Sequence, residues 1–162
     1  MFIGESHHAL DSKCRVFLPK RFQDELERET DGALTCFVTP GLDDCLYLFS
    51  VSGFRRAIER LDTAAFTSEQ GRDVQRDFFS RVHRVKLDSS GRLLVPDGLR
   101  DKLRGAKEVT MVGCMERAEI WPRDVRESRR DADQGLSTMN DILSGRLPGR
   151  STGGGAGADA RT

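Results

Sequence analysis

Short runs of apolar and alternating residues recur along the chain and predict β-strands more than long helices. The runs fall into two sets of four, at residues 6–10, 15–18, 34–38, 45–49, 83–87, 92–95, 108–112 and 118–121. In each set a proline, Pro19 or Pro96, follows the second run. Proline cannot donate a ladder hydrogen bond and therefore ends the strand. The pattern predicts a mixed α+β fold that is mainly β.

The two sets of runs belong to an internal sequence repeat. Residues 10–19 read LDSKCRVFLP and residues 87–96 read LDSSGRLLVP, an offset of 77. After a shortened connection the offset becomes 72, which aligns Gly41 with Gly113 and makes both glycines candidates for the last turn of each copy. We therefore expect two copies of one small β-rich unit, at 5–52 and 82–125.

Helical spacing is limited to short segments. One short helix is expected after each proline, where apolar residues lie four positions apart, at Phe22 and Leu26 or at Leu99 and Leu103. The segment 53–81 reads as a helical connector, with one apolar face at positions 54, 57, 58 and 61 and a weaker one at 74 and 78. Ser52 is the expected N-cap of its first helix.

The last segment, 126–162, has a weaker pattern of apolar residues. Leu136, Met139 and Leu143 fit one short amphipathic helix. Residues 151–162 are rich in glycine and alanine, and we expect them to be a disordered tail.

Each copy carries the turn motif Asp-x-x-x-Arg, as Asp11 to Arg15 and as Asp88 to Arg92. The aspartate can accept a backbone hydrogen bond two residues on, and Gly91 can adopt positive φ. The arginine follows the turn, and its planar guanidinium group has five N–H donors that suit a phosphate or a guanine. An internal Asp–Arg salt bridge explains the repetition equally well, and the two interpretations are compatible.

Charge and cysteine content restrict the function classes. Lys plus Arg and Asp plus Glu both total 26, which argues weakly against a DNA-binding monomer. The stretch 81–104 is nevertheless basic, with seven Lys or Arg against three Asp. Four cysteines and three histidines form no zinc pattern, so we expect reduced packing cysteines and no metal or other cofactor. No apolar run reaches membrane-spanning length and no secretory signal is visible, so a cytoplasmic protein is expected.

The motifs resemble those of the MraZ family of bacterial regulators. The similar residues are the start Met1-Phe-Ile-Gly4, His8, the two Asp-x-x-x-Arg motifs and the Pro-x-x-Phe or Pro-x-x-Leu that follows each. The resemblance covers about residues 1–125. It implies tandem SpoVT/AbrB-like units of the swapped-hairpin type, which form a pseudo-two-fold barrel on one chain.

The resemblance also implies a function. Such proteins assemble into rings, associate with the nucleoid and bind direct repeats in the promoter of the division and cell-wall gene cluster, typically their own promoter. The implied DNA contacts are Arg15 and Arg92, oriented by Asp11 and Asp88. Lys13, Lys20 and Arg21 are basic neighbours that fit phosphate. No small-molecule ligand is implied.

One position departs from the family pattern. Cys14 stands where the family has glycine, and a side chain in a left-handed turn costs on the order of 1 kcal/mol, so either the first turn is strained or its backbone differs. We expect Cys14→Gly to raise the melting temperature. The departure weakens the transfer of the DNA role to Arg15 more than the transfer to Arg92.

Two other classes of function are alternatives. An AbrB-like antitoxin-type module would bind a protein partner through its C-terminal segment. An enzyme would need a nucleophile elbow, a phosphate-binding loop or a ligand cluster, and none is visible. Asp11 and Asp88 could form a carboxylate pair across the pseudo-symmetry, but each belongs to a turn followed by an arginine. We therefore expect no enzymatic activity.

Overall fold

The computed structural model describes residues 1–59 and 68–130. The predicted helix through Leu136, Met139 and Leu143, the tail at 151–162 and Leu61 lie outside the described residues. Residues Met1–Glu127 form one unit by their internal contacts. Within the described part, no helix is long and apolar enough to cross a membrane.

The eight predicted strands are present, within one or two residues of their expected bounds. The first copy contains β1 (Glu5–Ala9), β2 (Arg15–Phe17), α1 (Lys20–Gln23), β3 (Glu27–Arg28), β4 (Leu34–Pro40) and β5 (Leu46–Phe49). The second contains β6 (His83–Lys86), β7 (Arg92–Leu94), the 3-10 helix η2 (Asp97–Leu103), β8 (Glu108–Cys114) and β9 (Arg117–Pro122). The two-residue strand β3 is too short to leave a pattern in the sequence and was not predicted.

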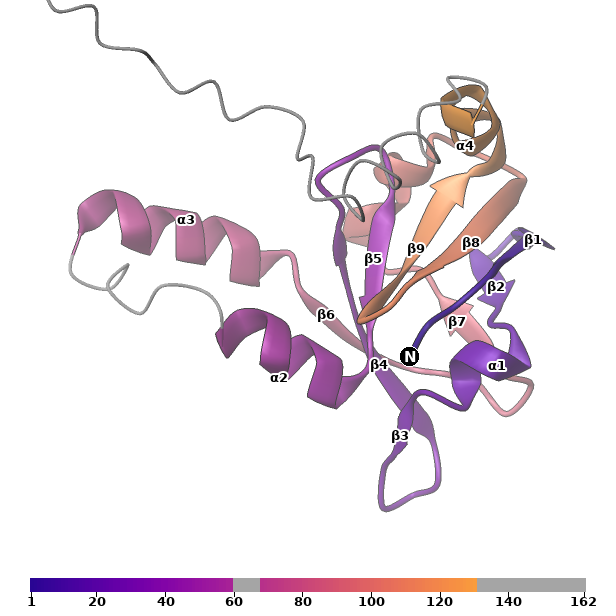
Figure 1. The fold of residues 1–162 in the computed structure, drawn as a ribbon, viewed down its shortest axis with the longest axis horizontal. Coiled ribbons are helices and arrows are strands. Elements are labelled where there is room, and N and C mark those ends of the chain that lie inside the picture. Colours follow the sequence, from indigo (N-terminus) through magenta and orange to yellow (C-terminus); the bar gives the residue numbers. More distant parts are fainter. Residues whose placement is uncertain (60–67, 131–162) are drawn as a thin grey trace, which may run out of the picture. The chain divides into compact units, whose positions relative to one another are not determined.

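The two copies exchange their opening hairpins. Strand β1 pairs with β8 of the second copy, and β6 pairs with β4 of the first, both antiparallel (Figure 1). Strands β9 and β5 join β8 to β4, and β3 pairs with β4 to complete the seven-stranded main sheet, whereas β2 and β7 form a separate two-stranded ladder. This cross-pairing within one chain confirms the swapped arrangement of tandem units. Because β2 and β7 leave the main sheet, its strand pairing does not by itself make a closed barrel.

A pseudo-two-fold axis relates the copies. In the β2–β7 ladder Val16 faces Leu93, and Arg15 and Phe17 face Leu94 and Arg92. Residues that are equivalent at the offset of 77 therefore exchange places across the ladder. The same holds at 72 for β5 and β9, where Leu46 pairs with Ile120 and Leu48 with Ala118.

The alignment of the two copies at the offset of 72 is wrong by one residue in β4 and β8. Ser6 pairs with Met111 and its equivalent His83 pairs with Val38, so Val38 corresponds to Met111 and not to Thr110. Gly113 consequently lies inside β8 and does not form the turn, contrary to prediction. A Cβ at Gly113 would lie 2.3 Å from the backbone N of Ile3, so glycine is needed for close approach of the N-terminal segment.

The core combines apolar residues from both copies. Val16, Leu18, Leu93 and Val95, the inward residues of the β2 and β7 arms, are fully buried. Phe2 from the N-terminal segment also joins this core, with its ring edge-on to Phe22 at 5.4 Å. Neither copy has a core of its own, because each arm fills the space beside the other copy's sheet.

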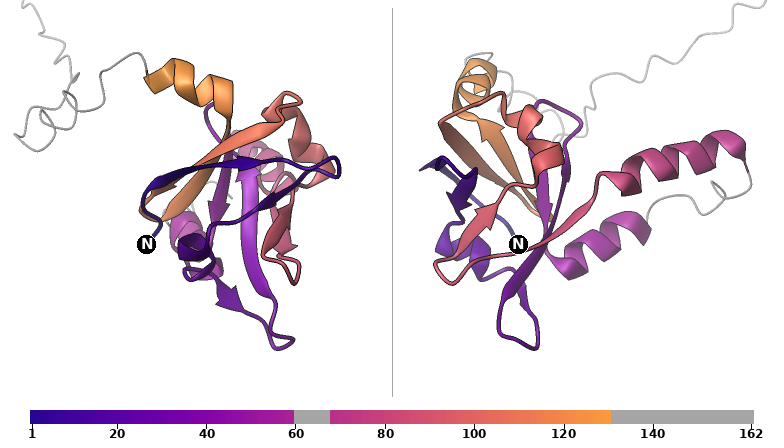
Figure 2. Two further views of the ribbon diagram at one scale, coloured as in Figure 1. Left: turned by 90° about the vertical axis from the view of Figure 1, so that its right-hand side faces the viewer. Right: turned by 180° about the vertical axis from the view of Figure 1, so that it is seen from behind.

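The connector contains α2 (Val51–Glu59) and α3 (Glu69–Ser80), and α4 (Arg123–Arg130) follows β9 (Figures 1 and 2). Helix α2 packs on the sheet through Phe54, whose ring stacks on Phe37 at 4.5 Å. The prediction of Ser52 as N-cap was wrong. The helix begins at Val51, two residues earlier than a Ser52 cap implies, and the Ser50 hydroxyl accepts the hydrogen bond from the Gly53 N–H.

A carboxylate from the first copy completes this cap. Glu27 on β3 accepts hydrogen bonds from the backbone N–H groups of Val51 and Ser52, at 2.8 and 2.9 Å. The first turn of α2 therefore has an anion at its positive end. Helix α3 is the predicted second helix of the connector, capped by Ser68, but it buries none of its residues. Val74 and Phe79 on α3 are 64% and 42% exposed.

Candidate nucleic-acid interface

The two Asp-x-x-x-Arg turns have the same internal geometry. Asp11 Oδ1 accepts hydrogen bonds from the backbone N–H groups of Lys13 and Arg15, both at 2.9 Å. Its Oδ2 accepts one from Arg15 Nε at 2.8 Å. One aspartate therefore closes the turn and fixes the arginine that leaves it.

Asp88 repeats this arrangement in the second copy. It accepts from the backbone N–H groups of Ser90 and Arg92 and, at 2.8 Å, from Arg92 Nε. These bonds, first of all the one from the backbone of the motif's arginine, lower the pKa of Asp11 and Asp88 below the ordinary value. Both carboxylates are therefore anionic at neutral pH.

The arginines remain accessible despite these salt bridges. The side chains of Arg15 and Arg92 are 30% and 36% exposed. Among the described residues, only Nε of each guanidinium has a hydrogen-bond partner. The terminal nitrogens can still donate to an external acceptor, so the salt-bridge interpretation and the DNA interpretation coexist in this geometry.

Both turns contain left-handed backbone before the arginine. Gly91 has φ 73° and Cys14 has φ 57°, so of the two alternatives for the first turn, strained or different backbone, the structure has the left-handed, strained one. Each turn is also held by the other copy's arm, because Leu18 N donates to Gly91 O and Val95 N donates to Cys14 O, at 3.0 and 2.9 Å. The sequence repeat did not reveal these cross-links, which depend on the β2–β7 pairing.

The two turns differ in the residue beneath them. Gln23 Nε2 donates to Leu18 O at 2.7 Å and lies where a Cβ on Gly91 would come within 2.4 Å. At the equivalent position of the second copy, Arg100 Nε donates to Val95 O at 3.2 Å. Cys14 can therefore carry a side chain in its turn, whereas Gly91 cannot without displacing Gln23.

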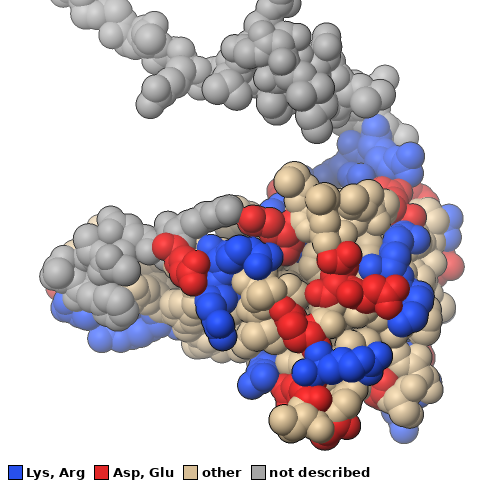
Figure 3. All heavy atoms as spheres, turned by 60° about the horizontal axis from the view of Figure 1, so that its bottom comes forward, with Lys and Arg blue, Asp and Glu red and all other residues tan. Residues whose placement is uncertain are grey.

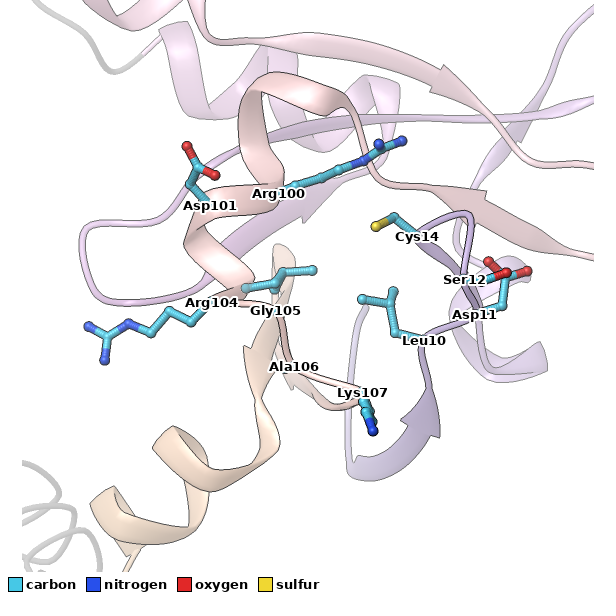
Figure 4. Close-up of a pocket in the computed structure, with 11 residues that line it drawn as sticks. Leu10, Asp11, Ser12, Cys14, Arg100, Asp101, Arg104, Gly105, Ala106 and Lys107 are labelled. Atoms are coloured by element: carbon cyan, nitrogen blue, oxygen red, sulfur yellow. The ribbon is translucent and has the colours of Figure 1, made fainter.

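A hollow of about 680 Å³ lies beside the first turn, between residues 10–14 and residues 100–107 (Figure 4). Leu10, Cys14 and the aliphatic part of Arg100 line it. Within the described residues, no group of three or more His, Cys, Asp or Glu side chains could hold a metal ion.

The other predicted basic residues differ in how they relate to the two turns. Lys13 is exposed within the first turn, next to the motif. Lys20 is ion-paired with Asp24 at 2.7 Å, and Arg21 donates to Ser6 Oγ at 3.1 Å. Among the described contacts, neither Lys20 nor Arg21 bonds to either turn. On the one face drawn in Figure 3, Lys and Arg side chains are interspersed with Asp and Glu side chains.

Two functional candidates were missed in the sequence. Phe17 and Leu94 alternate with the buried Val16 and Leu93, and both are 46% exposed. Their exposure places them on the outward face of the β2–β7 ladder, the face that also carries Arg15 and Arg92. Strict alternation along residues 15–18 and 92–95 could have identified both side chains.

These features define a class of protein, the tandem-repeat β proteins with exchanged hairpins. Two copies of one β unit exchange their opening hairpins within a single chain and place two aspartate-braced arginines on one ladder. The sequence model of the family described as "MraZ protein, putative antitoxin-like" matches residues 1–77 and 78–137.

Relatives agree with that match, and three of them carry the name "Transcriptional regulator MraZ". The one from Finegoldia magna is 38% identical over 124 residues, 76% of this chain and 82% of the relative. The one from Moorella thermoacetica is 38% identical over 136 residues, 83% and 91% of the two chains. The one from Clostridium beijerinckii is 35% identical over 146 residues, 88% and 99%. The chain belongs to the MraZ family.

Proposed function

We propose that this chain is a sequence-specific DNA-binding transcriptional regulator without enzymatic activity. One observation carries the proposal: two arginines, each fixed by its own aspartate, lie on the same outward face of a two-stranded ladder. A two-stranded ribbon fits the major groove, and a fixed guanidinium fits a guanine edge or a phosphate. The names of the relatives support the same class of function.

In this proposal Arg15 and Arg92 contact DNA, and Asp11, Asp88 and Gly91 hold their turns. Lys13, Lys20 and Arg21 supply phosphate contacts that set the register of the complex. The targets are direct repeats in the promoter of the division and cell-wall gene cluster, including the chain's own promoter. The protein acts in the cytoplasm, at the nucleoid.

A single protomer is a weak DNA ligand, since its formal net charge is zero. We infer that it acts as a homo-oligomer, arranged as a ring, in which successive contacts on spaced repeats become intramolecular. The unburied helix α3, with Val74 and Phe79 exposed, supports a contact with a second copy. A second protein co-purifying in stoichiometric amount would instead favour an antitoxin-like module.

The test is a binding titration on a duplex that carries the region upstream of the chain's own gene, at several salt concentrations. We expect Arg15→Ala and Arg92→Ala to abolish detectable promoter binding. Each two-pronged contact between an arginine and a guanine is worth about 1–3 kcal/mol, and the loss is repeated in every protomer of the assembly. Arg55→Ala, at an exposed position on α2, is the matched control.

Size-exclusion chromatography should show the same assembly for all of these variants. Unaltered affinity in both motif variants would remove the assignment of Arg15 and Arg92. A log–log salt slope near zero for the wild-type chain would exclude phosphate-driven recognition altogether.

A further inference from the structure

The outward face of the β2–β7 ladder carries four side chains around the pseudo-two-fold axis. Arg15 lies opposite Leu94, and Phe17 lies opposite Arg92. Directly opposed residues on one face have Cβ atoms roughly 5 Å apart, and diagonal neighbours lie roughly 7–8 Å apart. We call these four residues the ladder patch. Its two arginines occupy one diagonal and its two apolar residues the other.

Apolar side chains are unusual at these two positions. A ladder with one face on the core normally alternates apolar inward and polar outward residues. Val16 and Leu93 follow this rule, with no exposed surface, whereas Phe17 and Leu94 each leave 46% of their surface in water. The offset of 77 relates these two exposed residues, so the same exception occurs in both copies.

The Phe17 ring also has a neighbour that restricts its position. The ring centroid of His8 on β1 lies 6.2 Å from that of Phe17, with the ring planes tilted by 43°. Side chains fixed in this way lose little freedom on binding. Phe17, one of the two apolar residues of the patch, is therefore held beside the braced arginines.

The size of the patch limits its occupant. Two half-exposed apolar side chains offer far less surface than the roughly 800 Å² that each partner buries in a stable protein interface. The arginines beside them favour an anionic partner, and the major groove of DNA has room for a two-stranded ribbon. The apolar group that the major groove displays is the C5 methyl of thymine, which phenylalanine and other apolar side chains contact.

We propose that Phe17 and Leu94 are specificity residues that contact thymine methyl groups next to the bases or phosphates bound by Arg15 and Arg92. The inference depends on the proposed DNA-binding function and adds a base preference to it. Arginine donors recognise acceptors, and the apolar diagonal selects thymine over cytosine at the neighbouring positions.

The test compares thymine with uracil. Full-length protein is titrated by fluorescence anisotropy against two duplexes of the same upstream region, one of normal sequence and one with every thymine replaced by uracil. Uracil pairs identically and lacks only the methyl group. We expect the wild-type chain to bind the uracil duplex roughly four-fold more weakly for each methyl group contacted.

Phe17→Ser and Leu94→Ser should each reduce this preference, and the double variant should bind both duplexes with equal affinity. Leu42→Ser is the matched control, because Leu42 is an apolar residue 95% exposed outside the ladder, and it should keep the wild-type ratio. Thermal melting confirms that the variants fold, which their exposed positions favour.

The outcomes separate the two claims. Equal wild-type affinity for both duplexes, with salt-dependent binding retained, overturns the inference and leaves the proposed function intact. An undiminished preference in the double serine variant overturns it as well. No salt-dependent binding of either duplex overturns the proposed function. A serine variant that loses the native oligomer would assign the ladder patch to contacts between copies and also overturn the inference.

Discussion

The left-handed backbone at Cys14 allows a quantitative test of how the first turn is built. Cys14 has φ 57°, whereas its equivalent in the second copy is Gly91, with φ 73°. Cys14→Gly removes the side chain from the strained position. Cys14→Ala removes the thiol but keeps Cβ, so comparison of the two variants isolates the backbone strain.

The expected free-energy change is small because opposing contributions nearly cancel. A side chain in left-handed backbone lowers the free energy of unfolding by about 1–2 kcal/mol. Glycine lowers it by about 0.4–1 kcal/mol, because glycine raises the conformational entropy of the unfolded chain. Loss of the partly buried thiol costs roughly 0.5 kcal/mol more. Cys14→Gly should therefore stabilise the fold by about 0.3 kcal/mol and raise the melting temperature by about 1 °C. Cys14→Ala should melt about 2–3 °C below Cys14→Gly.

Scanning calorimetry on the full-length chain under reducing conditions measures these differences. A Cys14→Gly protein that melts at or below Cys14→Ala would refute the reasoning, since glycine would then relieve no strain at this position. Concentration is kept constant because the assembly state contributes to the melting temperature.

The reciprocal change at Gly91 is the matched control. A Cβ at Gly91 would lie 2.4 Å from Gln23 Nε2, which donates to Leu18 O. Gly91→Ala adds about 1–2 kcal/mol of strain, regains about 0.4–1 kcal/mol because alanine restricts the unfolded chain, and displaces a hydrogen bond worth about 1 kcal/mol. The melting temperature should fall by about 4–8 °C. In a Gln23→Ala background, the further loss caused by Gly91→Ala should be only about half as large.

Three further predictions concern other parts of the fold. The lowered pKa of Asp88, caused first by the Arg92 backbone N–H, means that its stabilising contribution is complete above the unfolded value of 3.8 and is lost as the pH falls through and below that value. Urea titrations between about pH 6 and pH 2.5 should therefore show a shallower acid loss for Asp88→Asn than for the wild-type chain. Glu27→Ala should lower stability by about 1–2 kcal/mol in urea titrations, because two N–H groups of α2 lose their acceptor, and an unchanged midpoint would contradict the capping role. Burial raises the pKa of Cys36 and Cys45 to about 12, so both thiols should react with a disulfide reagent only on unfolding, and fast labelling of either in the native protein would contradict their burial.

Much of the local structure could be predicted from the chain. The eight strands of the two copies and the short helices after Pro19 and Pro96 follow from alternation and from proline chemistry. Comparison of the two motifs singled out Cys14, but the choice between a strained turn and a different backbone needed the structure. The family assignment was also correct, because two motifs at a fixed spacing are far more specific than one.

The errors arose where neighbours remote in sequence decide the conformation. Ser52 was the wrong cap because the Glu27 carboxylate and the Ser50 hydroxyl together set where α2 begins. Gly113 was assigned to a turn, yet it lies within β8 because the N-terminal segment passes too close for a side chain. Neither contact leaves a trace in the local pattern of residues.

The sequence by itself determined the units: which segments are strands, where the turns fall and which arginines leave them. These properties depend on backbone chemistry and on residues a few positions apart. The family resemblance implied the exchange of hairpins, but only the tertiary structure decided the register in which each hairpin pairs with the other copy, and that Arg15, Phe17, Arg92 and Leu94 share one outward face. Side-chain alternation fixes which residues share a face of a strand, but the partner strand is chosen by burial of the shared core.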